Sequence, residues 1–246
     1  MKIYGVIPAR YSSSRLPGKV LLDIGGKSLV QRVYEQAIKV RGFEKVIIAV
    51  DDTKVADHVK SFGADWVMTR VDHNSGTDRC AEAVKSFKDC THVINIQGDE
   101  PFIHTDVMEG IIELFKSKES NIVSMMTPIL NKGDFHNPNV VKVVVDQNSD
   151  GLYFSRAAIP YQRENNIHSF TMNNFSFKHI GIYGFEVNTL NAITALPIGN
   201  LEQIEKLEQL RWLENGYKIR MGVTTHQGFG VDTEEDLQRA RDLVKS

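Results

Sequence analysis

The sequence predicts an α/β protein: a doubly wound, mostly parallel sheet into which a β-rich lobe is inserted. Short apolar runs alternate with amphipathic helical stretches through the first half of the chain, which is typical of this class. One run, residues 46–50, is apolar at every position, as expected for a parallel strand covered by helices on both faces. A change to β-rich sequence after residue 130 predicts the lobe.

The elements of the first half follow in strand–helix order. Continuous apolar runs predict the strands, and apolar residues at helical spacing, such as Leu29, Val33 and Ala37, predict the helices. Thr53 stands near the start of one predicted helix, and Ser75 or Thr77 is available to cap another. The expected strands are 3–7, 45–50, 65–68, 92–96 and 122–127, and the expected helices are 28–41, 53–62, 76–87 and 105–117.

The second half starts with strands. Asp150-Gly151 favours a hairpin turn between strands at 140–145 and 152–154. Leucines 207, 210 and 213 share one face of a predicted helix that Gly216 would end. The remaining expected elements are a mobile polar loop at 162–174, strands at 178–185 and 219–223, and helices at 202–215 and 233–244.

Length, charge and cysteine content limit the classes of protein to which this chain can belong. A chain of 246 residues suits one large domain with an inserted lobe. The net charge of −2 and the lack of a long Lys/Arg run argue against nucleic-acid and membrane binding. No run suits a membrane span or a signal peptide, so we expect a cytoplasmic protein. Cys80 and Cys90 lack metal-ligand spacing, and we expect them reduced.

A basic loop follows the first strand. Arg10, Arg15 and Lys19 stand among serines, prolines and glycine in residues 8–19. Ligands of open α/β sheets bind at the carboxyl ends of strands, and free N–H groups with fixed cations suit a polyphosphate. The alternative, a solvated basic loop, is weakened by carboxylates that stand at two further strand ends.

Those carboxylates suggest a magnesium site. Asp99 and Glu100 follow the strand at 92–96, and Asp232 precedes the last helix. Mg²⁺ needs oxygen ligands and usually takes one or two protein carboxylates. The alternative is that these residues cap the helices that follow them; for Asp232 alone, capping is the more ordinary interpretation, and only its pairing with Asp99 favours metal.

Further polar residues are ambiguous by themselves. Ser75, Gly76 and Arg79 at a helix start suit a base edge or a phosphate, although a plain helix cap explains them equally well. In the second half, polar side chains stand in an apolar context, where a buried Arg is costly unless it is paired. His179 is one of these, and it is equally well explained as a satisfied core histidine.

Motifs along the chain resemble those of the 3-deoxy-manno-octulosonate cytidylyltransferase (CMP-Kdo synthetase) family. They are Pro8-Ala9-Arg10 with Arg15-Leu16-Pro17-Gly18-Lys19, Gln97-Gly98-Asp99-Glu100-Pro101, Asn137-Pro138-Asn139-Val140-Val141-Lys142 and His179-Ile180-Gly181-Ile182-Tyr183. The resemblance extends from about Ile3 to the last helix. It implies a Rossmann-like nucleotidyltransferase fold and a cytoplasmic, Mg²⁺-dependent homodimer. Such an enzyme joins CTP and 3-deoxy-D-manno-octulosonate (Kdo) into CMP-Kdo and pyrophosphate for lipopolysaccharide synthesis.

The resemblance also implies roles for individual residues. The catalytic set would be Arg15 and Lys19 on the triphosphate, with Asp99 and Asp232 holding Mg²⁺. The nucleotide would contact Ala9, Arg10, Ser13, Ser75, Gly76, Arg79 and Gln97. The sugar would contact Arg156, Arg163, His179, Tyr183, Glu208 and Gln209. In this single domain, residues 1–130 and 217–246 would mainly bind nucleotide, and 131–216 would mainly form the sugar lobe.

One departure leaves the sugar open. Many relatives carry Trp and then Asp before the arginine that corresponds to Arg163, whereas this chain has Tyr161-Gln162. The alternatives are therefore a cytidylyltransferase for 8-amino-Kdo or for another acidic sugar such as a sialic acid. A non-catalytic nucleotide-binding module is a further alternative, since a fold does not fix a function, although a complete pair of metal carboxylates argues against it.

Overall fold

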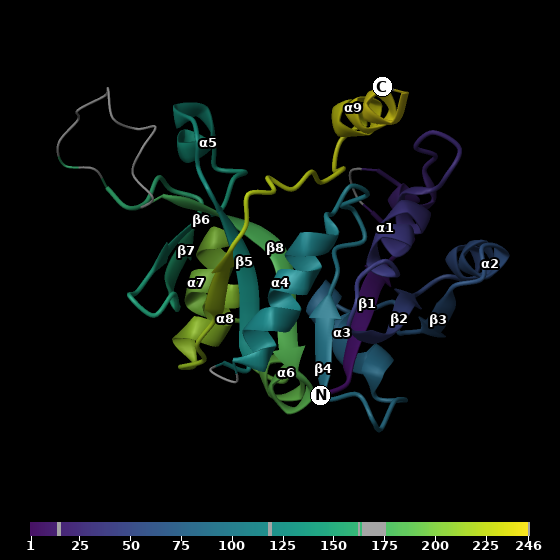
Figure 1. Cartoon of the computed structure of the whole chain (residues 1–246), viewed down its shortest axis with the longest axis horizontal. Helices are drawn as coiled ribbons and strands as arrows, with labels where there is room; N and C mark the ends of the chain where they lie inside the picture. Colours follow the sequence, from purple (N-terminus) through teal and green to yellow (C-terminus); the bar gives the residue numbers. More distant parts are fainter. Residues whose placement is uncertain (14–15, 118–119, 162, 164–175, 246) are drawn as a thin grey trace.

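The computed structural model describes residues 1–13, 16–117, 120–161, 163 and 176–245. Within these residues a single sheet runs through the molecule, with helices on both of its faces (Figure 1). Its strands are β1 (Ile3–Ala9), β2 (Phe43–Val50), β3 (Asp65–Met68), β4 (His92–Asn95), β5 (Ile122–Pro128), β6 (Lys142–Val145), β7 (Gly151–Ser155), β8 (Phe177–Glu186) and β9 (Arg220–Val223). The helices are η1 (Lys19–Leu21), α1 (Leu29–Ala37), α2 (Thr53–Ser61), α3 (Gly76–Val84), α4 (Thr105–Lys116), α5 (Lys132–His136), α6 (Val187–Thr194), α7 (Asn200–Glu205), α8 (Gln209–Glu214) and α9 (Glu234–Lys245).

The sheet is mostly parallel, with strand order β3-β2-β1-β4-β8-β5-β9. Strand β1 pairs in parallel with β2 and β4, β2 with β3, and β5 with β9. Strand β8 runs antiparallel between β4 and β5, and β6 with its partner β7 joins the sheet through β8. The expected doubly wound class is confirmed, and the carboxyl ends of β1, β2, β4, β5 and β9 share one edge.

Two apolar layers cover the sheet. Ile3 and Ile7 of β1 pack with side chains of α1, α2, α4 and α9, whereas Tyr4 and Val6 pack on the other face with those of α3, α6 and α8. Ile7 and Val6 have no exposed surface, and burying such a side chain contributes about 1.5–3 kcal/mol. This two-sided burial fixes the strands and holds the loops at their carboxyl ends in place.

The helix expected over 202–215 is wrong: the segment forms α7 and α8, separated by a break. Lys206 has a left-handed backbone, with φ 53°. The guanidinium of Arg156 takes the carbonyl that the next helical turn would use, because its Nε donates to Glu205 O at 2.7 Å. The sequence gives no local sign of this contact between residues far apart in the chain.

Helix α6 was not expected from the sequence. Its residues include β-branched and Asn side chains that favour helices weakly. Burial of Leu190 and Ile193 against the sheet stabilises it instead. Tertiary packing therefore outweighs local propensity in this segment.

Three further expectations have different outcomes. Cys80 and Cys90 are buried and free, as expected, and burial raises the pKa of Cys90 to about 11. None of the described helices combines the length and apolarity needed to cross a membrane. The loop expected to be mobile, 162–174, lies outside the described residues except for Arg163, so its mobility stays a prediction.

Candidate active site

A cleft of about 290 Å³ opens at the carboxyl edge of the sheet. Loops after β1 and β4, the start of α3 and the segment before α9 all contribute to it. Every described residue of the expected catalytic and nucleotide sets lines this cleft except Ala9, which is buried at the end of β1; Arg15 lies outside the described residues. The lining residues are Pro8, Arg10, Ser13, Lys19, Val20, His73, Asn74, Ser75, Gly76, Arg79, Gln97, Gly98, Asp99 and Asp232.

The ammonium group of Lys19 joins the two expected metal carboxylates. Its Nζ lies 2.8 Å from Asp99 Oδ2 and 3.0 Å from Asp232 Oδ1. Burial disfavours the charged amine, but the two carboxylates outweigh this effect and raise the pKa of Lys19. Two carboxylates from distant parts of the chain therefore face one point, and a cation fits between them.

The helix-capping alternative for these carboxylates is wrong. Helix α4 is capped by His104, whose Nδ1 accepts a hydrogen bond from the backbone N–H of Asp106 at 3.3 Å. Helix α9 is preceded by Thr233, whose Oγ1 accepts from the backbone N–H of Asp236 at 3.2 Å. Because other residues make the capping bonds, the Asp99 and Asp232 carboxylates are left to the cleft.

Backbone contacts hold the two loops of the cleft against each other. A Cβ at Gly98 would run into the carbonyl oxygen of Pro8, so only glycine allows this approach. The backbone N–H of Val231 donates to Asp99 O at 2.9 Å and ties the segment before α9 to the same loop. Within the basic loop, Gly18 adopts a left-handed conformation, with φ 66°.

Asp51 is a site residue that the sequence analysis missed. Its Oδ2 lies 3.0 Å from Arg79 Nη2, its Oδ1 accepts from the backbone N–H of Tyr11 at 2.8 Å, and its side chain is only 7% exposed. Thr69 Oγ1 also binds the Arg79 guanidinium, at 2.6 Å. Arg79 thus anchors α3 and the basic loop from the cleft wall. Asp51 directly follows β2, so the strand-end argument that found Asp99 could have found it.

The start of α3 connects the nucleotide side to the expected sugar side. Ser75 Oγ accepts from the backbone N–H of Asp78 at 3.0 Å, which confirms Ser75 as the helix cap. Thr77, the other candidate cap, instead donates from Oγ1 to Glu208 Oε2 at 2.7 Å. Burial raises the pKa of Glu208, although the hydroxyl groups of Thr77 and Ser75 oppose the rise. Glu208 therefore contacts the start of α3, where Ser75 lines the cleft.

Strands β4 and β8 bring two unsatisfied polar atoms together. Asn95 and Tyr183 are register partners, and both Asn95 Oδ1 and Tyr183 Oη are buried with no hydrogen-bond partner among the described residues. Burial, with a smaller contribution from Glu208, raises the pKa of Tyr183 well above its usual value. Gln97 Nε2 donates to Gly181 O at 2.9 Å beside them. Unpaired buried groups cost about 1–3 kcal/mol each, so they are typical of a ligand-binding position.

The other expected sugar residues have varied surroundings. His179 Nε2 lies 2.9 Å from Ser124 Oγ, its ring packs against Phe154, and burial lowers its pKa to about 3. These contacts satisfy it as a core histidine. Arg156 is bound by backbone carbonyls, Gln209 is buried, and Arg163 is exposed. Their roles as sugar ligands stay predictions.

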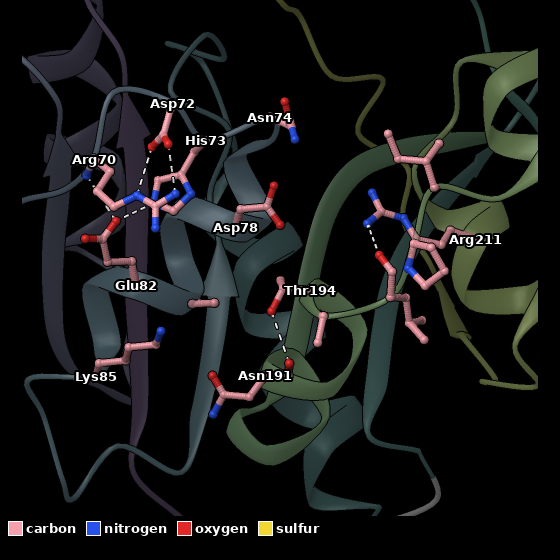
Figure 2. Close-up of a pocket in the computed structure, with 15 residues that line it drawn as sticks. Arg70, Asp72, His73, Asn74, Asp78, Glu82, Lys85, Asn191, Thr194 and Arg211 are labelled. Carbon is pink, nitrogen blue, oxygen red and sulfur yellow. Dashed lines mark hydrogen bonds and ion pairs between the residues drawn. The ribbon is translucent and has the colours of Figure 1, made fainter.

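A larger cavity, of about 790 Å³, lies between α3 and α6 (Figure 2). It shares His73 and Asn74 with the cleft but contains none of the expected catalytic residues. Two pairs of its charged side chains contact each other: Arg70 Nε lies 2.8 Å from Asp72 Oδ1, and His73 contacts Glu82. The smaller cleft, with its cation and two carboxylates, is therefore the candidate active site.

Comparisons with known proteins show which family the chain belongs to. The cytidylyltransferase family model matches residues 4–219. The chain is similar to 3-deoxy-manno-octulosonate cytidylyltransferases of Thermodesulfovibrio yellowstonii (47% identical, covering 98% of this chain and 97% of that protein) and Parabacteroides distasonis (45%, covering 98% and 97%).

Two solved structures extend the comparison. The structure of a CMP:2-keto-3-deoxy-manno-octonic acid synthetase complexed with CTP is 40% identical and superposes with a TM-score of 0.92, covering 100% of this chain and 99% of that one. A 4-diphosphocytidyl-2C-methyl-D-erythritol synthase from Anaerococcus prevotii, 13% identical, superposes with a TM-score of 0.64, covering 100% and 99%. The second likeness extends to the fold alone.

Proposed function

Because the chain belongs to the cytidylyltransferase family, and is thus a nucleotidyltransferase, we propose that it couples CTP to Kdo, giving CMP-Kdo and pyrophosphate. One observation carries the proposal. Lys19, Asp99 and Asp232 meet in one cleft, in a chain that matches Kdo cytidylyltransferases over nearly its whole length. A cation beside paired carboxylates is what phosphoryl-transfer chemistry uses to position and neutralise a triphosphate.

The proposed reaction is an in-line displacement at phosphorus. The oxygen of the anomeric C2 hydroxyl bonds to the α-phosphorus of CTP, the bond from that phosphorus to the β-phosphate oxygen breaks, and pyrophosphate leaves. The hydroxyl proton passes to solvent. Arg10 and Lys19 line the cleft and would stabilise charge on the departing pyrophosphate. Catalysis then comes mainly from positioning and charge stabilisation.

Asp99 and Asp232 fit a magnesium ion. An oxygen of each lies within 3.0 Å of the same ammonium nitrogen, so both already converge on a cation, and oxygen donors are the ligands that Mg²⁺ prefers. We assign the ion to these two carboxylates. When bound there, it would neutralise charge on the α-phosphate and the leaving group.

We assign the acceptor sugar to the lobe of residues 131–216, which meets the cleft where Gln97 Nε2 donates to Gly181 O. Tyr183 Oη and Asn95 Oδ1, both unsatisfied, would bind hydroxyl groups of the sugar. Arg156 already donates to Glu205 O at 2.7 Å and Pro138 O at 3.0 Å. We therefore favour the exposed Arg163 as the cation for the sugar carboxylate.

The resemblance to this family supports a wider setting for the proposal. We propose that the enzyme acts in the cytoplasm, as a homodimer, and that its product is used for lipopolysaccharide synthesis. Light scattering of the purified protein tests the dimer: a mass near twice the 27.7 kDa of one chain is expected, and a mass of one chain would contradict it.

The reaction is tested by pyrophosphate release with Mg²⁺. CTP is compared with ATP, GTP and UTP, and Kdo with 8-amino-Kdo and a sialic acid. Release with CTP and Kdo is expected. Release with CTP and 8-amino-Kdo or a sialic acid, but not with Kdo, would support the cytidylyl-transfer reaction and identify a different acceptor sugar. CTP binding without release to any acceptor would favour a non-catalytic nucleotide-binding protein.

A further inference from the structure

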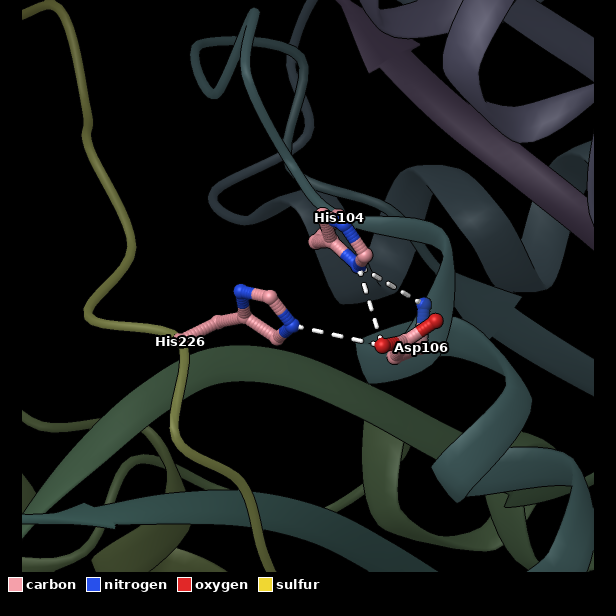
Figure 3. Close-up of side chains that lie close together, drawn as sticks. All are labelled: His104, Asp106 and His226. Atoms are coloured by element: carbon pink, nitrogen blue, oxygen red, sulfur yellow. Dashed lines mark hydrogen bonds and ion pairs between the residues drawn. The ribbon is translucent and has the colours of Figure 1, made fainter.

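A second cluster of ligand-type side chains lies outside the cleft. His104 and Asp106 stand at the start of α4, and His226 comes from the connector between β9 and α9 (Figure 3). Nδ1 of His104 and Nε2 of His226 each lie 3.4 Å from Asp106 Oδ2, and the three ligand atoms lie within 4.8 Å of one another. The two imidazole rings are stacked, with centroids 3.8 Å apart.

The spacing of these atoms also suits a metal. His226 Nε2 and Asp106 Oδ2 form a hydrogen bond of 3.4 Å, which is long beside the typical range of about 2.7–3.2 Å. This distance matches the edge of a tetrahedron around Zn²⁺, which is about 3.4 Å for bonds of about 2.0–2.1 Å. Metal–imidazole bonds lie in the plane of the ring, so one of the two stacked, solvent-accessible rings would turn on binding. Two imidazoles and a carboxylate are also a common protein ligand set for Zn²⁺, with a fourth position left for water.

The hydrogen bonding of His104 supports the same conclusion. Its Nδ1 accepts from the backbone N–H of Asp106 at 3.3 Å, so this nitrogen presents a lone pair on the side where the Asp106 carboxylate lies. A lone pair and a carboxylate at this distance repel each other unless a proton or a metal cation lies between them. The cap bond is long and therefore weak, so a metal–nitrogen bond can replace it.

We propose that His104, Asp106 and His226 bind a divalent transition-metal cation of the zinc type, at a site distinct from the carboxylates of the cleft. The side chains are exposed or half-exposed, so a cation from solvent can reach them. Mg²⁺ is a poor occupant because it takes oxygen ligands in octahedral geometry.

The site would join the two segments that carry Asp99 and Asp232. His104 follows shortly after Asp99, and His226 stands shortly before Asp232. His104 and His226 also line a cavity of about 220 Å³, together with Glu100 and Phe229. A cation there would fasten the connector to α4 and restrict the movement of the segment that ends in Asp232.

Binding is tested by calorimetric titration of the chelator-treated full-length protein with ZnCl₂. We expect one equivalent to bind the wild type, and at least about 10-fold weaker binding for His226→Gln and for His104→Asn, because each loses one of three protein ligands. Asn at position 104 keeps a helix-capping side chain. Substitution with Co²⁺ should give the visible absorption of a tetrahedral site.

His136→Gln is the matched control, because His136 is an exposed histidine on α5, outside the cluster. It should bind zinc like the wild type. Asp106→Asn provides a third test of the cluster should either histidine variant fold poorly, as judged by circular dichroism. Equal zinc affinity of the wild type and the cluster variants, or an equal loss in His136→Gln, would overturn the proposal.

Hydrogen exchange provides a readout independent of affinity. Zinc should slow exchange of the backbone amides of residues 224–233 in the wild type, because a ligand fixed at both ends of a connector reduces its opening. The His226→Gln variant should show no such protection. Unchanged exchange in the zinc-bound wild type would contradict the clamp between the connector and α4.

Discussion

At the scale of single residues, Lys19 determines the charge balance of the cleft. Its ammonium lies within 3.0 Å of one oxygen each of Asp99 and Asp232, so two carboxylates can face each other without leaving their negative charges unopposed. Thr233 and His104 make the helix caps that these acids could have made. Among the described residues, neither acid makes a capping bond of this kind, and both contact the ammonium of Lys19.

The first prediction concerns Asp99→Asn. The substitution keeps the shape of the side chain but removes its charge, so we expect kcat to fall at least about 10²-fold, as when another stabiliser of transition-state charge is lost. Pyrophosphate release at saturating CTP, Kdo and Mg²⁺ measures it. Asp57→Asn, at an exposed position on α2, should retain full activity. Near-normal turnover of the Asp99 variant would exclude the proposed metal role.

The second prediction concerns His179 and pH. Burial lowers its pKa to about 3 from a usual value of 6.5. Below pH 6.5 the unfolded chain therefore binds a proton that the folded chain does not, and stability falls as the pH is lowered towards 3. Allowing for partial exposure, the free energy of unfolding should lose about 1 kcal/mol per pH unit through this group.

Urea unfolding of the wild type and of His179→Asn, from about pH 7 to about pH 5, tests this effect. Asn can keep a hydrogen bond to Ser124 but does not titrate. The stability of the wild type should fall more steeply with acid than that of the variant. Parallel pH profiles would show that His179 does not cause the acid sensitivity.

At the scale of elements, the cleft depends on how closely its loops approach. The loop after β4 passes the loop after β1 at Gly98, where a Cβ would meet the carbonyl oxygen of Pro8. The sequence marks both loops through their glycines, prolines and charges. It does not mark the contact between Arg156 and Glu205 that separates α7 from α8, because the two residues lie far apart along the chain.

The third prediction follows from the close contact between these two loops at Gly98. Gly98→Ala should push the two loops apart, lower stability by about 1–3 kcal/mol and lower kcat/KM at least about 10-fold, because the basic loop and Asp99 would lose their relative positions. Urea unfolding and pyrophosphate release measure the two effects. Gly230→Ala is the control, since a Cβ there has no atom within 4 Å; equal behaviour of both variants would refute the steric argument.

At the scale of the whole molecule, the candidate active site is assembled from residues that lie far apart in the sequence. Lys19 and Asp232 are 213 residues apart and are 3.0 Å apart in space. Nucleotide binding should therefore stabilise the entire fold rather than one half of it, because the ligand binds only the state in which both ends are in place.

The fourth prediction expresses this as a melting temperature. CTP at about 100 times its Kd should stabilise the protein by about 2.7 kcal/mol, which is about 5–10 °C for a domain of this size. With Mg²⁺ present, Asp232→Asn should show a smaller shift than the wild type. Without Mg²⁺ the two should respond alike. If the wild type and Asp232→Asn show equal shifts in melting temperature both with and without Mg²⁺, Asp232 is not a metal ligand.

Much of the fold and of the cleft is predictable from sequence because their signals are local. Apolar runs identify the strands, and the polar residues that follow β1 and β4 indicate Lys19 and Asp99 before any contact is known. Asp232 lies before α9, and only its pairing with Asp99 indicated a metal role. Asp51 was missed although it stands at such an end, because its partner Arg79 belongs to another element. The break at Lys206 and the helix α6 result from tertiary contacts, which no local pattern contains.

The position of β8 has a consequence for biosynthesis. On the ribosome, β4 is complete at residue 95, but its neighbour β8 begins only at Phe177. Until then the nascent chain has a half-finished sheet whose β4 edge has unpaired N–H and C=O groups beside buried apolar side chains. Such edges are templates for intermolecular pairing. During the stretch of translation between these two strands, the β4 edge is therefore open to pairing with another chain.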